Sequence, residues 1–305
     1  MEFFKKQTAI DFMGLRKWSA IFSLLLFFAS TFSLIKNSLT WGLDFTGGTQ
    51  AQLHYQSSAN LSTIREQLVK ANFDKAIVQS YGSSEDALVS LPPSPTLSQQ
   101  ALKEKLLTAL PGAELQRIES VGPEVGQELA TKGGLAILVA LLGIVLYISM
   151  RFEYRLAISA VLALIHDPIL ILGVFSHYHI EFNLTALAAL LAVLGYSLND
   201  TIVIFDRVRE NFRKIRKSTP IEIMNLSINQ TLSRTIMTSV ITLIVVTALF
   251  IYGGEMIHNF SLALIIGIII GTYSSIYVAG ALAIALGLNK KDLMPTPKKA
   301  IDDRP

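Results

Sequence analysis

Residues 184–205 read LTALAALLAVLGYSLNDTIVIF, and this stretch decides the fold class of the chain. It is long enough to cross a membrane as a single helix, which needs about 20 mostly apolar residues. Within it stand Asn199 and Asp200. An aspartate at the centre of such a helix costs roughly 2.5–3.5 kcal/mol on insertion. The stretch therefore predicts a membrane helix in which Asp200 has a task of its own.

Five more stretches of the same kind accompany it. Of the 305 residues, 51% are hydrophobic and 16% are charged, against roughly 25% charged residues in ordinary soluble domains. The apolar residues are gathered into long runs, which excludes a purely soluble enzyme and a disordered chain. The absence of cysteine excludes a disulfide scaffold and thiolate metal sites. The further predicted membrane helices cover residues 18–35, 133–150, 156–175, 235–252 and 260–286.

The first of these runs, 18–35, has to be distinguished from a secretory signal. Its apolar run is longer than the core of a typical signal peptide, and no A-x-A-like cleavage site follows in residues 36–41. We therefore interpret it as a retained membrane anchor.

Lys and Arg residues orient the six predicted helices. They gather in the N-terminal segment 1–17, in the links after 150 and 205, and in the C-terminal tail 287–305, whereas the links 176–183 and 253–259 hold none. Since cytoplasmic loops are enriched in Lys and Arg, both termini are predicted to be cytoplasmic. The same rule accounts for the basic run at 207–217, so we expect no nucleic-acid partner.

Residues 36–132 have the composition of a soluble domain and lie between the first two predicted spans, which places them outside the cytoplasm, in the periplasm. The pattern predicts a ferredoxin-like α+β domain of order β-α-β-β-α-β. No cluster of His and carboxylates accompanies it, and we expect neither a metal nor an organic cofactor. Its predicted strands are 45–55, 76–81, 87–91 and 114–120, its helices are 61–71, capped by Asn60, and 96–110, and a turn lies at 82–84.

Asp200 and Arg234 are candidates for a functional pair. Asp200 stands about five residues from the cytoplasmic end of its helix, or roughly 8 Å deep at 1.5 Å per residue. So short a side chain cannot reach water from there, so it needs a partner, a water path or a proton. Arg234, which follows a helix opened by a capping box at 219–222, could form a charge-assisted pair with it. The alternative is a neutral aspartate that only bonds a neighbouring helix.

His166 and Asp167 form a second polar spot, near the middle of the helix 156–175 and directly before Pro168. A proline removes one helical hydrogen bond and tends to kink the helix. The spot is either a hydrated site or a set of hydrogen bonds that holds the helices together.

The last predicted helix, 260–286, carries a stripe of small residues that recur every four positions. Such a stripe allows close approach of another helix, within the bundle or on a partner. It predicts packing and not a chemical site. The stripe comprises Ala263, Gly267, Gly271, Ser275, Ala279, Ala283 and Gly287.

Several motifs resemble those of the SecD/SecF family, whose more distant relatives are the RND transporters. Residues 41–49, WGLDFTGGT, resemble the family signature that follows the first span, with Gly42, Asp44, Gly47 and Gly48 in it. Residues 195–213, GYSLNDTIVIFDRVRENFR, resemble the fourth-span motif. Residues 231–235, TLSRT, and 260–280 are similar to the fifth and sixth spans. We interpret the signature glycines as structural, because they give the backbone freedom or allow close packing.

The resemblance implies a function in protein export. It implies a polytopic protein of the bacterial inner membrane that partners SecD and acts with the SecY–SecE–SecG channel on a translocating polypeptide. YajC and YidC are further candidate partners, and SecA acts indirectly. The proton gradient is the implied energy source, with Asp200 and Arg234 in proton conduction and His166, Asp167 and Asn199 in support. No covalent chemistry is implied, so we expect no enzyme.

Two other functions remain open from the sequence. One is half of an RND-type exporter of small molecules, against which the single small external domain argues. The other is a passive scaffold for SecD, which predicts that Asp200 and Arg234 are dispensable.

Overall fold

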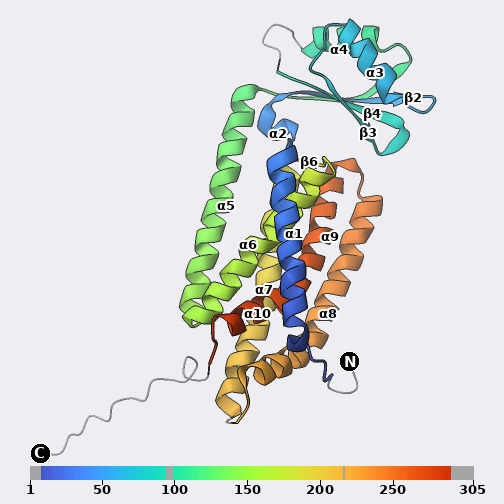
Figure 1. Cartoon of the computed structure of the whole chain (residues 1–305). Helices are drawn as coiled ribbons and strands as arrows, with labels where there is room; N and C mark the ends of the chain where they lie inside the picture. Colours follow the sequence, from blue (N-terminus) through green and yellow to red (C-terminus); the bar gives the residue numbers. More distant parts are fainter. Residues whose placement is uncertain (1–7, 94–98, 216, 290–305) are drawn as a thin grey trace, which may run out of the picture.

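The computed structural model describes residues 8–93, 99–215 and 217–289, and within these ranges six helices are long and apolar enough to cross a membrane. They form one bundle with a small α/β domain at one end (Figure 1). The predicted fold class is therefore confirmed. The spans are α1 (Arg16–Asn37), α5 (Pro123–Arg151), α6 (Tyr154–His177), α7 (Leu184–Lys214), α8 (Pro220–Tyr252) and His258–Ala285, and the short helix η1 (Met13–Leu15) precedes α1.

Most helices extend beyond their apolar cores. α5 begins at Pro123, inside the range predicted for the external domain, and α7 continues past residue 205 to Lys214. α8 begins at Pro220 with the predicted capping box, in which the Thr219 side chain accepts from the Glu222 backbone and Glu222 reaches back to Thr219. Apolar runs mark only the part of a helix that lies in hydrocarbon, so polar helical ends escape that criterion.

The last span is not one regular helix. It consists of α9 (His258–Tyr273), a π-helical turn η3 (Ser274–Val278) and α10 (Ala279–Ala285). A stripe that recurs every four residues drifts around an α-helix of 3.6 residues per turn. Ala279 and Ala283 are buried, as Gly271 is, but Gly271 meets Ser197 of α7 whereas α10, beyond the π turn, packs mainly against α6.

The α/β domain contains the predicted β-α-β-β-α-β order. The four strands pair in the order β3-β4-β2-β5, and every neighbouring pair is antiparallel. Asn60 caps the first helix by accepting from the backbone of Ser62 and Thr63, as predicted. Its elements are β2 (Gly48–Tyr55), α3 (Leu61–Lys70), β3 (Ile77–Tyr81), β4 (Ser83–Leu91), α4 (Gln99–Ala109) and β5 (Ala113–Val121).

Two local predictions in this domain were wrong. Residues 43–46 form the short helix α2 (Leu43–Thr46) and not the beginning of a strand. The chain leaves α2 through Gly47 and Gly48, whose φ values of 66° and 125° are accessible to glycine. The turn after β3 is also tighter than predicted, since Tyr81 pairs with Ser83 around Gly82.

The two faces of the sheet differ. One face packs against α3 and α4 around a core that includes Ala51, Leu53, Ile64 and Val89. The opposite face carries polar side chains and points toward the helix bundle (Figure 1). This polar face and the end of the bundle enclose a crevice.

The domain is tied to the bundle at two places. The strand β1 (Thr40–Trp41) pairs in parallel with β6 (Glu181–Phe182), directly before α7. At the other attachment a single residue, Gly122, separates β5 from α5. Short connections of this kind make the orientation of the domain sensitive to any movement of the helices.

Candidate functional site: a polar centre on α7

Asp200 lies on the buried side of α7. The residue is only 3% exposed, and its Oδ2 atom is buried without a hydrogen-bond partner among the described residues. An ionised carboxylate in such surroundings is costly unless it is paired. The site therefore favours uptake of a proton, entry of water or approach of a cation.

Arg234, on α8, is the cation that the sequence suggests as a partner for Asp200. Its charge acts on Asp200 through space, yet no ion pair within 4.0 Å joins the two described side chains. The predicted direct pair is therefore absent from this structure. Arg234 is exposed at the surface of the isolated chain, whereas its neighbour Thr235 is buried.

A second set of polar residues surrounds Asp167 on α6. Asp167 is fully buried, its Oδ1 lies 3.0 Å from Nδ1 of His166, and its Oδ2 accepts a 2.5 Å hydrogen bond from Ser197 of α7. The ring of His166 also stacks on Phe27 of α1. The predicted polar spot on this span thus forms hydrogen bonds between helices.

The part of α7 around Ser197 also forms hydrogen bonds with the π turn of the last span. Ser275 donates to the carbonyl oxygen of Ser197 at 3.0 Å, and its hydroxyl lies 2.9 Å from that of Thr201. Sequence reasoning missed Ser197 and Thr201 as members of the centre. The available signal was the position of Ser197, which lies three residues before Asp200 and four before Thr201, because positions three and four apart share one side of a helix.

The α9 part of the small-residue stripe lies against α7. A Cβ atom added to Gly267 would meet Cγ1 of Val193 at 2.7 Å, and one added to Gly271 would meet Cβ of Ser197 at 2.9 Å. These glycines let α9 approach α7 closely. Asn199 differs, since it is exposed and makes no hydrogen bond to any described residue. It does not join the buried centre in this chain.

The signature segment 42–48 holds the other end of α7. Oδ2 of Asp44 accepts a 2.8 Å hydrogen bond from the backbone of Leu184, the first residue of α7. Gly42 donates to the carbonyl oxygen of Phe182, and a Cβ there would lie 2.9 Å from Glu181 and Asn183 side-chain atoms. The segment thus connects α7 to the α/β domain.

Comparison with known proteins identifies the family. The profile of the protein export membrane protein SecD/SecF C-terminal family matches residues 101–289, and that of the SecD/SecF GG motif matches residues 32–59. The chain belongs to the SecD/SecF family. It is similar to protein translocase subunit SecF of Vibrio alginolyticus, at 53% identity over 95% of this chain and 94% of the relative. It is also similar to the SecF subunit of Pseudomonas aeruginosa, at 48% identity over 97% and 98% of the two chains.

The SecD/SecF architecture is found in a solved structure as well. The crystal structure of SecDF, a translocon-associated membrane protein from Thermus thermophilus, matches with a TM-score of 0.84 and 37% identity over 91% of this chain. The match spans 38% of the SecDF chain. The present chain is therefore an integral membrane protein of a protein-export family and corresponds to part of the larger SecDF chain.

Proposed function

We propose that this chain pairs with SecD in the bacterial inner membrane, with both termini cytoplasmic, and uses the proton gradient to promote late steps of polypeptide translocation through the SecY channel. The observation that carries the proposal is the buried Asp200 carboxylate with an unpartnered oxygen, within electrostatic range of Arg234. One proton that moves down a potential of about 100 mV releases roughly 2.3 kcal/mol. That energy is comparable to the cost of a buried charge on this helix.

The proposed coupling between Asp200 and the α/β domain runs through α7. Asp200 is part of the 31-residue helix α7, whose first residue is held by Asp44. Asp44 belongs to α2, and the chain continues from α2 into the central strand β2. When Asp200 takes up a proton, its attraction to Arg234 is lost and the packing of α7 against α8 changes. A displacement of α7 then moves the α/β domain through this connection.

The test is export into inverted membrane vesicles with and without an imposed proton gradient. Asp200→Asn keeps the size of the side chain but fixes it as neutral, so we expect the gradient-dependent part of export to disappear while the subunit still assembles. Asp206→Asn is the matched control on the same helix. Asp206 already has Arg151 at 2.7 Å and Arg209 at 3.7 Å and is partly solvated. It should therefore retain gradient dependence.

The outcome distinguishes a motor subunit from a scaffold. If Asp200→Asn, at normal protein levels, exports with unchanged gradient dependence, the chain is a passive scaffold for SecD. The matching family is one of protein export, which supports this function over export of small molecules.

A further inference from the structure

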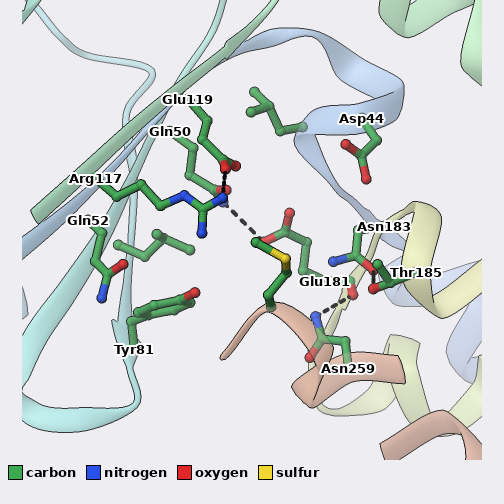
Figure 2. A pocket seen from close by; sticks show the side chains of 13 residues that line it. Asp44, Gln50, Gln52, Tyr81, Arg117, Glu119, Glu181, Asn183, Thr185 and Asn259 are labelled. Carbon is green, nitrogen blue, oxygen red and sulfur yellow. Dashed lines mark hydrogen bonds and ion pairs between the residues drawn. The ribbon is translucent and has the colours of Figure 1, made fainter. Parts of the chain in front are cut away.

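A polar crevice of about 270 Å³ lies between the free face of the sheet and the adjacent end of the helix bundle. Gln50, Gln52 and Arg117 line it from the sheet. Glu181, in β6 at the end of the bundle next to the sheet, lies across from them, as Figure 2 shows. From its position and lining we propose that this crevice binds a short, extended, basic stretch of polypeptide. The inference rests on the proposed function, because it assigns the translocating chain a contact site on this subunit.

The charge of the crevice favours a cationic ligand. Three carboxylates, those of Asp44, Glu119 and Glu181, line it together with one guanidinium, that of Arg117. Arg117 forms its ion pair with Glu119 and not with Glu181. The lining therefore carries an excess of negative charge, which disfavours a phosphate headgroup and favours a lysine or arginine side chain.

Glu181 is the carboxylate with which such a lysine or arginine side chain would form an ion pair. Its carboxylate accepts a 3.3 Å hydrogen bond from Gln50, and no cation of the described chain lies within 4.0 Å of it. Burial raises the pKa of Glu181; hydrogen bonds from the Leu43 backbone and from Gln50 oppose this effect, and nearby Asp44 adds to it. A carboxylate that is partly desolvated and lacks a counter-ion gains most when an ammonium or guanidinium group approaches.

The remaining polar groups suit a peptide backbone. Asn259 donates its amide to the Glu181 carbonyl. Asn183 accepts through Oδ1 and leaves its amide nitrogen free of described partners on the crevice side (Figure 2). Gln52 donates to Gln116 and keeps its own oxygen. Side-chain amides supply both donors and acceptors, and an extended chain presents both along its backbone.

The size of the crevice sets the length of the ligand. Pockets for drug-sized molecules measure about 300–1,000 Å³, so a crevice just below this range holds only a few residues at a time. Its lining is mixed, since Leu43, Leu88 and Met256 stand among the polar side chains. Weak binding of a short segment is what a chain in transit requires, because a tight grip would stop it.

The test uses the purified full chain in nanodiscs and two labelled extended peptides, in which serine alternates with lysine or with glutamate. Fluorescence anisotropy should show binding of the lysine peptide and at least about tenfold weaker binding of the glutamate peptide. Glu181→Gln should weaken the lysine peptide by about tenfold. Glu66→Gln, on the exposed face of α3 on the other side of the sheet, is the matched control and should change nothing.

The position of the ligand is tested by disulfide formation, for which the cysteine-free chain is suited. A lysine peptide that carries one cysteine should crosslink to Gln52→Cys and not to Ser62→Cys on α3. Equal binding of the two peptides, an equal effect of Glu66→Gln, or crosslinking of Gln52→Cys to a thiol-reactive lipid headgroup in place of the peptide would overturn the proposal. No proton gradient is present in these assays, so their failure is separate from a failure of Asp200→Asn in export.

Discussion

Gly271→Ala should destabilise the packing of the last span on α7. The added methyl carbon would lie 2.9 Å from Cβ of Ser197 and 3.2 Å from its hydroxyl oxygen. Carbon atoms pack best at about 3.5–4.0 Å, so the two helices must separate by about 0.6 Å or more. Overpacking of this kind costs about 1–3 kcal/mol.

The separation also affects the polar centre, since Ser197 donates the 2.5 Å hydrogen bond to buried Asp167. Gly143→Ala on α5 is the matched control, because a Cβ there meets nothing within 4 Å. Both variants gain the same helix propensity, so the difference between them isolates the clash. We expect the purified full chain with Gly271→Ala to unfold at a lower temperature than that with Gly143→Ala.

A double mutant identifies the atom responsible. Ser197→Gly removes the colliding carbon, so Gly271→Ala should cost less in its presence than in its absence, although Ser197→Gly is itself destabilising. If Gly271→Ala unfolds at or above the temperature of Gly143→Ala, or if the two costs simply add, the close approach of these helices is not what holds the last span in place.

Three further predictions address the α/β domain and its orientation. Asp44→Ala removes the acceptor at the start of α7 and should cost about 0.5–2 kcal/mol, measured by thermal unfolding; an unchanged transition would show that the cap contributes nothing. The hydrogen bond with Asp86, 2.8 Å long, raises the pKa of His54, and the hydrogen bonds from Ser83 and His54 lower the pKa of Asp86. Stabilisation by this pair should be lost as pH rises through the pKa of His54 and as pH falls through that of Asp86, and His54→Gln should flatten the alkaline side of a stability–pH profile. In sealed cells an impermeant thiol reagent should label Ser57→Cys and spare Ser218→Cys, and the reverse pattern would invert the predicted topology.

The sequence predicts those features that depend on local chemistry. The capping box at Thr219, the cap at Asn60 and the order of strands and helices follow from patterns within a few residues, and each is confirmed. The apolar runs identify the six spans because the bilayer sets their length. Their ends are less predictable, since the polar turns of α5 and α7 continue the helices outside the hydrocarbon region.

Features that depend on contacts between distant segments were not predictable. The π turn at Ser274–Val278 lies where Ser275 hydrogen-bonds Ser197 and Thr201 of α7, and no local signal marks it. The absence of a direct bond between Asp200 and Arg234 depends on the rotation of α8 about its own axis, which sequence spacing does not fix. Glu181 carries no motif, and its importance appears only when the sheet is placed across from it (Figure 2).

The polar centre and the crevice share one rigid element, and this links their chemistry. Asp200 follows Leu184 by 16 residues on α7, which is about 24 Å at 1.5 Å per residue. Asn183 and Thr185, at the start of the same helix, line the crevice, and Glu181 precedes them by two residues or more. A helix transmits axial displacement along its length with little loss, so a shift of 1–2 Å, typical of helix movements in switching proteins, would move these groups directly. The sheet with Gln52 and Arg117 is also attached to α5 through Gly122, so it would follow α7 only in part and the spacing across the crevice would change. Such a shift exceeds the tolerance of a hydrogen bond. A change of charge at Asp200 would thus alter how firmly the crevice holds a polypeptide, without any contact between the proton and the ligand.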